Sequence, residues 1–207
     1  MADLSIDPSR LHGREGYFLL TSLVVPRPIA WVSTLAADGT RNLAPHSYFN
    51  AVSSDPLIVH FTQTGEKDSL RNVRATGEFV VNIVSADLLE PMNLTAADFP
   101  PEEDEFAWAG LEAAPSAVVA PPRVAAARGA LECRLLDIVS MGNGNMVFGE
   151  VVHLHVAASV WRDGRVDPTL LRPVGRLAGS AYAIVTDITK IPRPTYDGLR
   201  DARHGAP

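Results

Sequence analysis

The chain has 207 residues, of which 46% are hydrophobic and 20% charged, a composition typical of an ordinary globular domain rather than of a disordered chain. Its formal net charge of -6 argues against binding to a nucleic-acid backbone, and a single cysteine, Cys133, excludes an internal disulfide framework. No apolar run approaches membrane-spanning length, and no signal-peptide pattern is present. We therefore expect a cytoplasmic protein with neither a nucleic-acid nor a membrane partner.

The first segments in chain order are a polar arm over residues 1–16 and an apolar stretch over residues 17–25. The pattern of this stretch fits either a short helix or a strand, and Pro26 and Pro28 end it. Both structures stay open for this stretch.

Three β segments are predicted next, and they cover residues 29–35, 42–52 and 57–61. Asp38-Gly39 supplies a turn that permits positive φ after the first segment, and the sequence SSDP supplies another before the third. Pro45 limits regular pairing at one point of the middle segment.

These segments carry more hydrogen-bonding side chains than an apolar core strand needs. The residues concerned are Ser33, Thr34, Asn42, His46, Ser47 and Asn50. Such groups need a hydrogen-bonding partner when they leave water. The pattern therefore indicates either a polar ligand lying against the strands or a solvated sheet face.

A loop at residues 62–66 leads into a predicted helix that Asp68 or a neighbour caps and that Gly77 stops. A helix N-terminus attracts anions because its free backbone N–H groups converge there. Lys67 adds a positive charge and Ser69 a hydroxyl, and both suit a phosphate group. An ordinary charged surface turn is the alternative interpretation of this segment.

The rest of the chain is predicted to hold further strands with short helices between them. A strand over residues 79–84 precedes a short helix that Ser85 can cap and that Pro91 interrupts or kinks. Residues 100–122 are predicted to form a surface excursion, in which the acids of residues 102–105 are a solvated run. Two long strands and a last element follow, over residues 131–139, 146–157 and 176–186, before an arm or partly disordered tail beyond Pro192.

The sequence shows no catalytic dyad, and we predict no metal site. His153 and His155 project from the same face of one strand, with His46 or His60 as conceivable completions, but nothing in the sequence fixes a third metal ligand. The segment GNGNMVFG lacks the spacing of a dinucleotide fingerprint, and no serine has a nucleophile-elbow context. Cys133 is predicted to be a small buried hydrophobic residue rather than a nucleophile.

An ordered series of motifs covers nearly the whole chain and is similar to one known family. In chain order the motifs are RPIAWVST, DG, NLAPHSYFN, EKDSLRN, GEFVVNIV, VFGEVVHLHV and RLAGSAY. The series resembles the flavin reductase-like, FMN-binding split-barrel family, in its flavoredoxin-like branch. The strand pattern alone indicates a mainly β or α+β fold, and the resemblance implies a Greek-key split β-barrel with a few short helices. We accordingly expect an N-terminal arm over residues 1–16, an FMN-binding split-barrel domain over residues 17–192 and a C-terminal tail over residues 193–207.

The resemblance implies that NADH or NADPH passes a hydride to bound FMN, and that the protein positions the reactants without a catalytic residue of its own. The cofactor-binding residues that it implies are Ser33, Thr34, Asn42, Ser47, Phe49, Asn50, Lys67, Ser69, Arg176 and Tyr182. Ser69 stands where the family usually carries Thr, and the hydroxyl is kept. For Arg176 and Tyr182 a core or interface role is the alternative. Trp31 and His46 are further candidates for the nicotinamide side, with core packing favoured for Trp31.

The resemblance also implies a homodimer with flavin near the interface, and a monooxygenase or another redox protein as a second partner. Two other classes of function stay open: an FMN electron carrier that a protein partner reduces, and a β-barrel domain that has lost its flavin. Retention of Lys67, Ser69 and Asn50 argues against the second of these. The sequence does not separate the reductase from the carrier.

Overall fold

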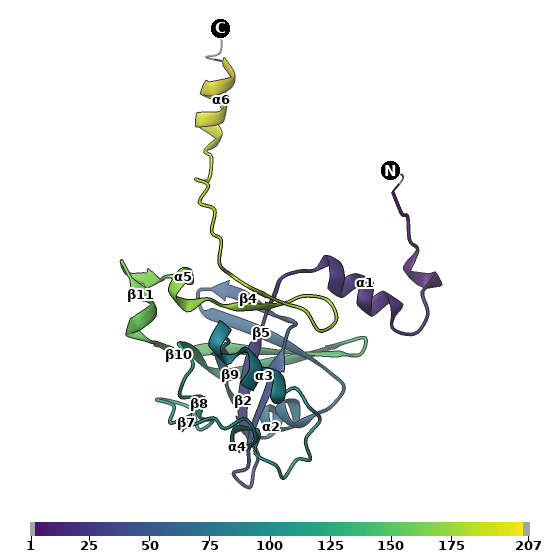
Figure 1. Cartoon of the computed structure of the whole chain (residues 1–207), viewed down its shortest axis with the longest axis vertical. Helices are drawn as coiled ribbons and strands as arrows, with labels where there is room; N and C mark the ends of the chain where they lie inside the picture. Colours follow the sequence, from purple (N-terminus) through teal and green to yellow (C-terminus); the bar gives the residue numbers. More distant parts are fainter. Residues whose placement is uncertain (1–2, 205–207) are drawn as a thin grey trace.

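The computed structural model describes residues 3–204, and its largest element is a seven-stranded antiparallel sheet. The strands lie side by side in the order β3-β2-β6-β9-β10-β5-β4. Their bounds are β2 (Ala30–Leu35), β3 (Arg41–His46), β4 (Phe49–Ser54), β5 (Leu57–Thr64), β6 (Glu78–Ile83), β9 (Gly129–Met141) and β10 (Gly144–Val156). Only Ser47 and Tyr48 join the two edge strands β3 and β4, so the two edges meet and the sheet curls into a barrel (Figure 1).

Shorter elements surround the barrel. One three-stranded sheet contains β1 (Arg27–Pro28), β13 (Val174–Arg176) and β14 (Tyr182–Ile184), and the two-stranded pairs are β7 (Ala113–Ala114) with β8 (Arg123–Val124) and β11 (Trp161–Arg162) with β12 (Arg165–Val166). The α-helices are α1 (Glu15–Leu23), α2 (Asp68–Thr76), α3 (Leu89–Leu94), α4 (Glu105–Trp108), α5 (Pro168–Leu171) and α6 (Tyr196–His204). Three 3-10 turns cover Pro8–Arg10, Ala86–Leu88 and Ala158–Val160.

Consecutive side chains of a strand point to opposite faces of the sheet. In β2 the side chains on both faces are buried, so each face packs in a core of its own. Ala30 and Val32 belong to the core of the barrel, which also contains Phe61 of β5. Helix α2 contributes Leu70 and Val73 to the same core, as its apolar spacing predicts. The helix ends at Gly77, which has the left-handed φ of 71° that we expect of a helix-stopping glycine.

The opposite face of β2 packs in a second core outside the barrel. Trp31 is fully buried there with Met92 of α3 and Phe106 of α4. Its Nε1 donates a hydrogen bond to Thr95 Oγ1 at 2.9 Å. The prediction that Trp31 is a core residue is therefore confirmed.

Gly149 of β10 lies where two buried side chains leave no room for a Cβ atom. A Cβ built at this position would lie 2.7 Å from Phe79 Cε1 and 3.1 Å from Cys133 Cβ. We expect Gly149→Ala to lower the free energy of unfolding by about 1–3 kcal/mol, because overpacking a closed core forces its neighbours to move. Urea unfolding followed by circular dichroism measures this change. Gly129→Ala is the matched control, since its nearest atom is Ile83 Cγ1 at 3.4 Å; equal stability of the two variants would contradict the prediction.

Several predicted boundaries need correction. The stretch over residues 17–25 is helical as far as Leu23, and α1 begins at Glu15, within the segment predicted as an arm. Residues 62–64, predicted as a loop, continue β5 because they pair with residues 144–146 of β10. Residues 42–52 are two strands, with the break at Ser47 and Tyr48, and residues 176–186 contain the turn of the β13–β14 hairpin rather than one element.

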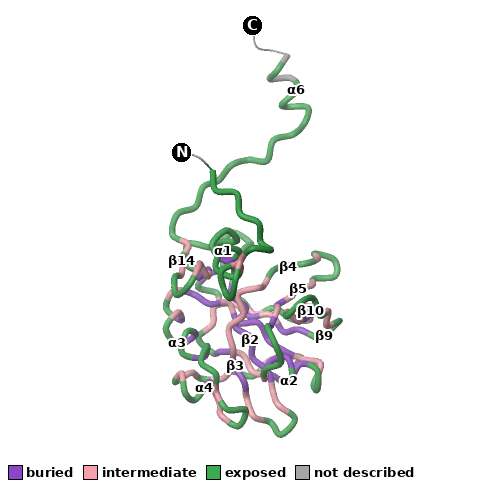
Figure 2. Tube along the Cα trace, turned by 90° about the vertical axis from the view of Figure 1, so that its right-hand side faces the viewer, coloured by how far each residue is buried: buried purple, intermediate pink, exposed green. Residues whose placement is uncertain are grey.

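Both described ends of the chain lie on the same side of the barrel (Figures 1 and 2). Helix α6 stands away from the barrel at the end of an extended segment (Figure 1). Helix α1 is apolar but mostly exposed, with Thr21 as its only described buried residue. Within residues 3–204, no helix has the length and apolar character needed to cross a membrane.

Candidate functional site

A cavity of about 740 Å³ lies where the β3–β4 connection, the end of β5 and the start of α2 meet. Small organic ligands and cofactors typically occupy cavities of roughly 300–1,000 Å³. Residues 95–99, which follow α3, form a further wall. Four of the predicted cofactor residues line this cavity, namely Asn42, Ser47, Lys67 and Ser69.

The first turn of α2 gives this cavity the properties of an anion site. Lys67 is the N-cap residue, and its own side chain makes no cap hydrogen bond. Among the first N–H groups of the helix, that of Leu70 donates to Gln63 Oε1 at 3.2 Å. Asp68 forms an ion pair with Arg71 and not with Lys67, so its negative charge is compensated within the turn. Lys67 Nζ lies 2.5 Å from Asp98 Oδ1, but both side chains are largely exposed, and such pairs contribute only about 0–1 kcal/mol. A phosphate group can therefore replace Asp98 beside Lys67 at little cost.

A buried hydrogen-bond network lies next to Ser69. Asn42 Nδ2 donates to Glu105 Oε1 at 2.7 Å, and Leu43 N donates to Glu105 Oε2 at 3.0 Å. Asn42 Oδ1 accepts from Ser69 Oγ at 3.1 Å and from Thr34 Oγ1 at 3.2 Å. Burial raises the pKa of Glu105, although its hydrogen bonds act in the opposite direction. Because a hydroxyl has one hydrogen, Ser69 must release Asn42 before it can donate to a phosphate.

The position of Glu105 corrects the prediction of a solvated acidic run. Glu105 is only 5% exposed. Asp104 caps α4 by accepting a hydrogen bond from Phe106 N at 2.9 Å, and it also pairs with Arg41 of β3. The ion pair between Asp104 and Arg41 anchors the start of α4 against β3, and Glu105 then lies beside Asn42. The apolar residue Phe106, directly after the acids, was the local signal that this segment packs inward.

His46 lines the same cavity as a neutral imidazole. Its Nε2 lies 3.3 Å from Ser69 Oγ, and its ring packs against Phe61 with a centroid separation of 4.7 Å. Burial, and to a smaller extent the positive charge of Lys67, lowers the pKa of His46 to about 4. At neutral pH, His46 therefore adds no charge to the cavity.

A second, smaller cavity of about 180 Å³ adjoins the first and shares some of its wall. The shared residues are Tyr17, Pro45, Ser47 and Ala96. Arg176 and Tyr182, both predicted cofactor residues, line this smaller cavity and not the one beside Lys67. Six of the ten predicted cofactor residues thus line one or both of two neighbouring cavities.

The remaining predicted cofactor residues lie outside both cavities. Ser33 and Thr34 are fully buried, and Ser33 Oγ donates to Pro122 O at 2.5 Å. Phe49 packs against the barrel core, and Asn50 is exposed on β4. The polar groups of β2 thus face neither solvent nor a ligand cavity; other parts of the chain satisfy them.

Some residues of the cavity walls were not singled out from the sequence, among them Tyr17, Gln63, Ala96 and Phe99. Gln63 is 4% exposed; its Oε1 accepts from Leu70 N at 3.2 Å, while its Nε2 has no partner among the described residues. No local pattern marks these positions, because the walls come from segments far apart in the sequence.

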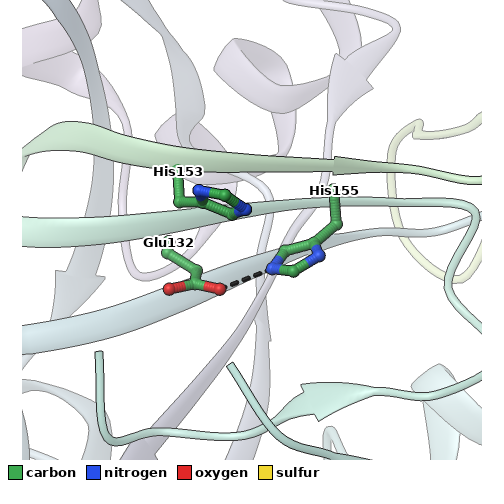
Figure 3. A group of neighbouring side chains, drawn as sticks. All are labelled: Glu132, His153 and His155. Atoms are coloured by element: carbon green, nitrogen blue, oxygen red, sulfur yellow. Dashed lines mark hydrogen bonds and ion pairs between the residues drawn. The ribbon is translucent and has the colours of Figure 1, made fainter. Parts of the chain in front are cut away.

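Glu132 of β9 lies beside His153 and His155 of β10 (Figure 3). The two histidines share one face, as predicted, and the possible ligand atoms of all three residues lie within 4.8 Å of one another. However, the carboxylate of Glu132 already has four hydrogen-bonding partners. His155 Nε2 lies 2.5 Å from its Oε1, and the other partners are the backbone N–H groups of Ala117, Val118 and Val119. These bonds use the lone pairs that a carboxylate offers, so we assign the group a structural role.

The fold and the cavity can now be compared with known proteins. Residues 22–170 match the family described as Flavin reductase like domain. This match covers well over half of the chain. The chain therefore belongs to the flavin reductase-like family and has a split-barrel fold with a few short helices.

Three solved structures illustrate this relationship. Nitrilotriacetate monooxygenase component B from Bacillus cereus is 34% identical, with a TM-score of 0.89 over 92% of this chain and 100% of that one. The 2-nitrobenzoate 2-nitroreductase NbaA of Pseudomonas fluorescens is 35% identical, with a TM-score of 0.87 over 93% of this chain and 98% of that one. Flavoredoxin of Desulfovibrio vulgaris, at 23% identity, shares the fold, with a TM-score of 0.76 over 81% and 91%.

Proposed function

We propose that the 740 Å³ cavity binds FMN and that the chain is a flavin reductase that uses NADH or NADPH. The observation that carries this proposal is that Lys67 and Ser69 at the start of α2 line a cavity large enough for a cofactor, and that the N-cap side chain leaves the first N–H groups of the helix uncapped. Lys67 and the N–H groups of Asp68 and Ser69 would hold the phosphate, with the Ser69 hydroxyl as a further donor once it leaves Asn42. Membership of the flavin reductase-like family supports the same assignment.

Bound FMN supplies the hydride chemistry, since its ring accepts a hydride from a reduced nicotinamide. The residues of the chain bind and orient the reactants. His46 is neutral, and the carboxylate of Glu105 is engaged with Asn42 and Leu43. We therefore assign neither residue the role of proton donor; that no single acid or base carries the reaction stays a prediction.

Reduced flavin or its electrons would then pass to a second reactant. The relative from Bacillus cereus is component B of a monooxygenase, which favours a separate oxygenase as the recipient. An electron carrier that a redox protein reduces is the alternative function. In either case a cytoplasmic location stays a prediction.

The chain would act as a homodimer, with α1 in the interface. A helix that is apolar on all sides is stable only when another surface covers it. Within the described chain, α1 leaves five large apolar side chains exposed: Tyr17, Phe18, Leu19, Leu20 and Leu23. Because Tyr17 also lines both cavities, a second copy packed on α1 would lie next to the proposed flavin site.

Anaerobic reduction of the FMN-loaded protein tests the proposed activity. We expect the oxidised-flavin band to bleach much faster after addition of NADH or NADPH than the band of free FMN at the same concentration. Stopped-flow absorbance measures both rates. A protein-bound band that survives both nicotinamides would reject the reductase and favour the electron carrier.

A further inference from the structure

The smaller cavity brings a guanidinium group together with two buried apolar side chains among other polar and apolar ones. Arg176 lies at the end of β13, with its guanidinium carbon 4.4 Å from the centroid of the Tyr182 ring. The cavity that both residues line also contains Ile29 and Met92. Such a combination of one cation and an apolar wall suits a ligand with an apolar body and an anionic group.

The described side chains place no carboxylate on the guanidinium of Arg176. Its guanidinium donates to Tyr182 Oη and to Gly179 O, which are both neutral oxygen atoms. Among the side chains described within residues 3–200, no carboxylate forms an ion pair with it. A guanidinium has five N–H donors, and two of them are used here. The others can bind a planar carboxylate in the two-bond geometry that arginine favours.

Neighbouring contacts hold this arginine in place. Tyr182 Oη donates in turn to Asn93 Oδ1 at 2.9 Å, so the Tyr182 hydroxyl links Arg176 to α3. The guanidinium is thus oriented before any ligand arrives, which lowers the entropy cost of binding an anion.

The size of the cavity limits the body of the ligand. Its volume is about 180 Å³, below the roughly 300–1,000 Å³ that drug-sized ligands fill. It holds about one substituted ring, and a dinucleotide is too large for it. Ser47 belongs to both cavities.

We propose that this cavity is a binding site for a small aromatic carboxylate, with the carboxylate on Arg176 and the ring against Ile29 and Met92. The site goes beyond the proposed flavin reductase function and does not depend on it, because none of these three residues lines the cavity beside Lys67. An aromatic acid bound here would lie next to the larger cavity.

Calorimetric titration of the full-length, flavin-free protein tests this proposal with three probes. Benzoate carries the ring and the charge, benzamide the ring alone, and inorganic phosphate the charge alone. We expect benzoate to bind at least about tenfold more tightly than benzamide or phosphate, since charged hydrogen bonds are about twice as strong as neutral ones. Absence of benzoate binding would overturn the proposal. Phosphate is titrated into Lys67→Ala, so that the proposed FMN phosphate site does not contribute. Phosphate binding there as tight as that of benzoate would overturn the proposal too, by showing a general anion site such as one for a dinucleotide phosphate.

Variants then locate the carboxylate. We expect Arg176→Gln to weaken benzoate binding about 10- to 100-fold and the exposed-site control Arg165→Gln to leave it unchanged. If both variants lost benzoate affinity equally, or if Arg176→Gln lost none, Arg176 would not be the residue that binds the carboxylate. A measurement without mutation covers the case in which Arg176→Gln does not fold. Benzoate should shift the Met92 methyl signal among the four methionines of the wild-type chain, and an unmoved Met92 would contradict the site.

Discussion

Lys67→Ala is expected to weaken FMN binding by about 10- to 100-fold and to leave riboflavin binding nearly unchanged. The two ligands differ in the phosphate, and charge-assisted hydrogen bonds to such a group contribute about 1.5–3 kcal/mol. Breaking the wild-type ion pair between Lys67 and Asp98 costs little of this binding free energy, because both side chains are largely exposed. Titrations that follow the quenching of flavin fluorescence give both dissociation constants.

Lys190→Ala is the matched control, because Lys67 and Lys190 are the two lysines of the chain and Lys190 is exposed far along the tail. It should bind both flavins like the wild type. If Lys67→Ala weakened FMN and riboflavin equally, the start of α2 would be an ordinary charged turn rather than a phosphate site.

Glu132→Gln is expected to lower the free energy of unfolding by about 3 kcal/mol at neutral pH. Burial alone raises the pKa of Glu132, but three backbone N–H groups and His155 outweigh burial and lower it to about 2. The ordinary value is 4.5, and a shift of this size corresponds to about 3 kcal/mol. An amide at this position also turns an NH₂ group toward backbone donors that then lack an acceptor.

The pH dependence follows from the direction of that shift. Because the folded-state pKa is below the unfolded-state pKa, the stabilisation is complete above pH 4.5 and is lost as the pH falls towards 2. Urea unfolding between pH 7 and pH 2.5 should show the wild type and Glu132→Gln converging below pH 4.5. The exposed-site control Glu90→Gln should stay close to the wild type throughout. If the free energies of unfolding of the wild type and Glu132→Gln differed by the same amount at every pH, ionisation of Glu132 would not stabilise the fold.

Local patterns in the sequence were enough to predict much of the fold. The strand β2, the helix α2 and its stop at Gly77 follow from apolar spacing and from the ability of glycine to adopt positive φ. Cys133 is a buried hydrophobic residue, as predicted, and burial raises the pKa of its thiol. The lysine and serine at the start of α2 do line the large cavity.

The errors have a common physical origin in contacts between distant segments. The acids around Glu105 resemble a solvated run until Arg41, some sixty residues earlier, binds Asp104 and α4 packs on β3. Ser33 seemed suited to a ligand because its partner, the carbonyl of Pro122, lies on a remote loop. The structural role of Glu132 could not be predicted from the sequence. Its partners are backbone N–H groups of a segment that lies beside it only in the folded chain.

The central claim is that the start of α2 holds the phosphate of FMN, and a crystal structure of the chain soaked with FMN tests it most directly. We predict that the phosphate lies within hydrogen-bonding distance of Lys67 Nζ and the first-turn N–H groups of α2, with Asp98 displaced from Lys67. Flavin bound elsewhere, or bound in this cavity with its phosphate away from α2 and the Lys67–Asp98 pair intact, would contradict the claim.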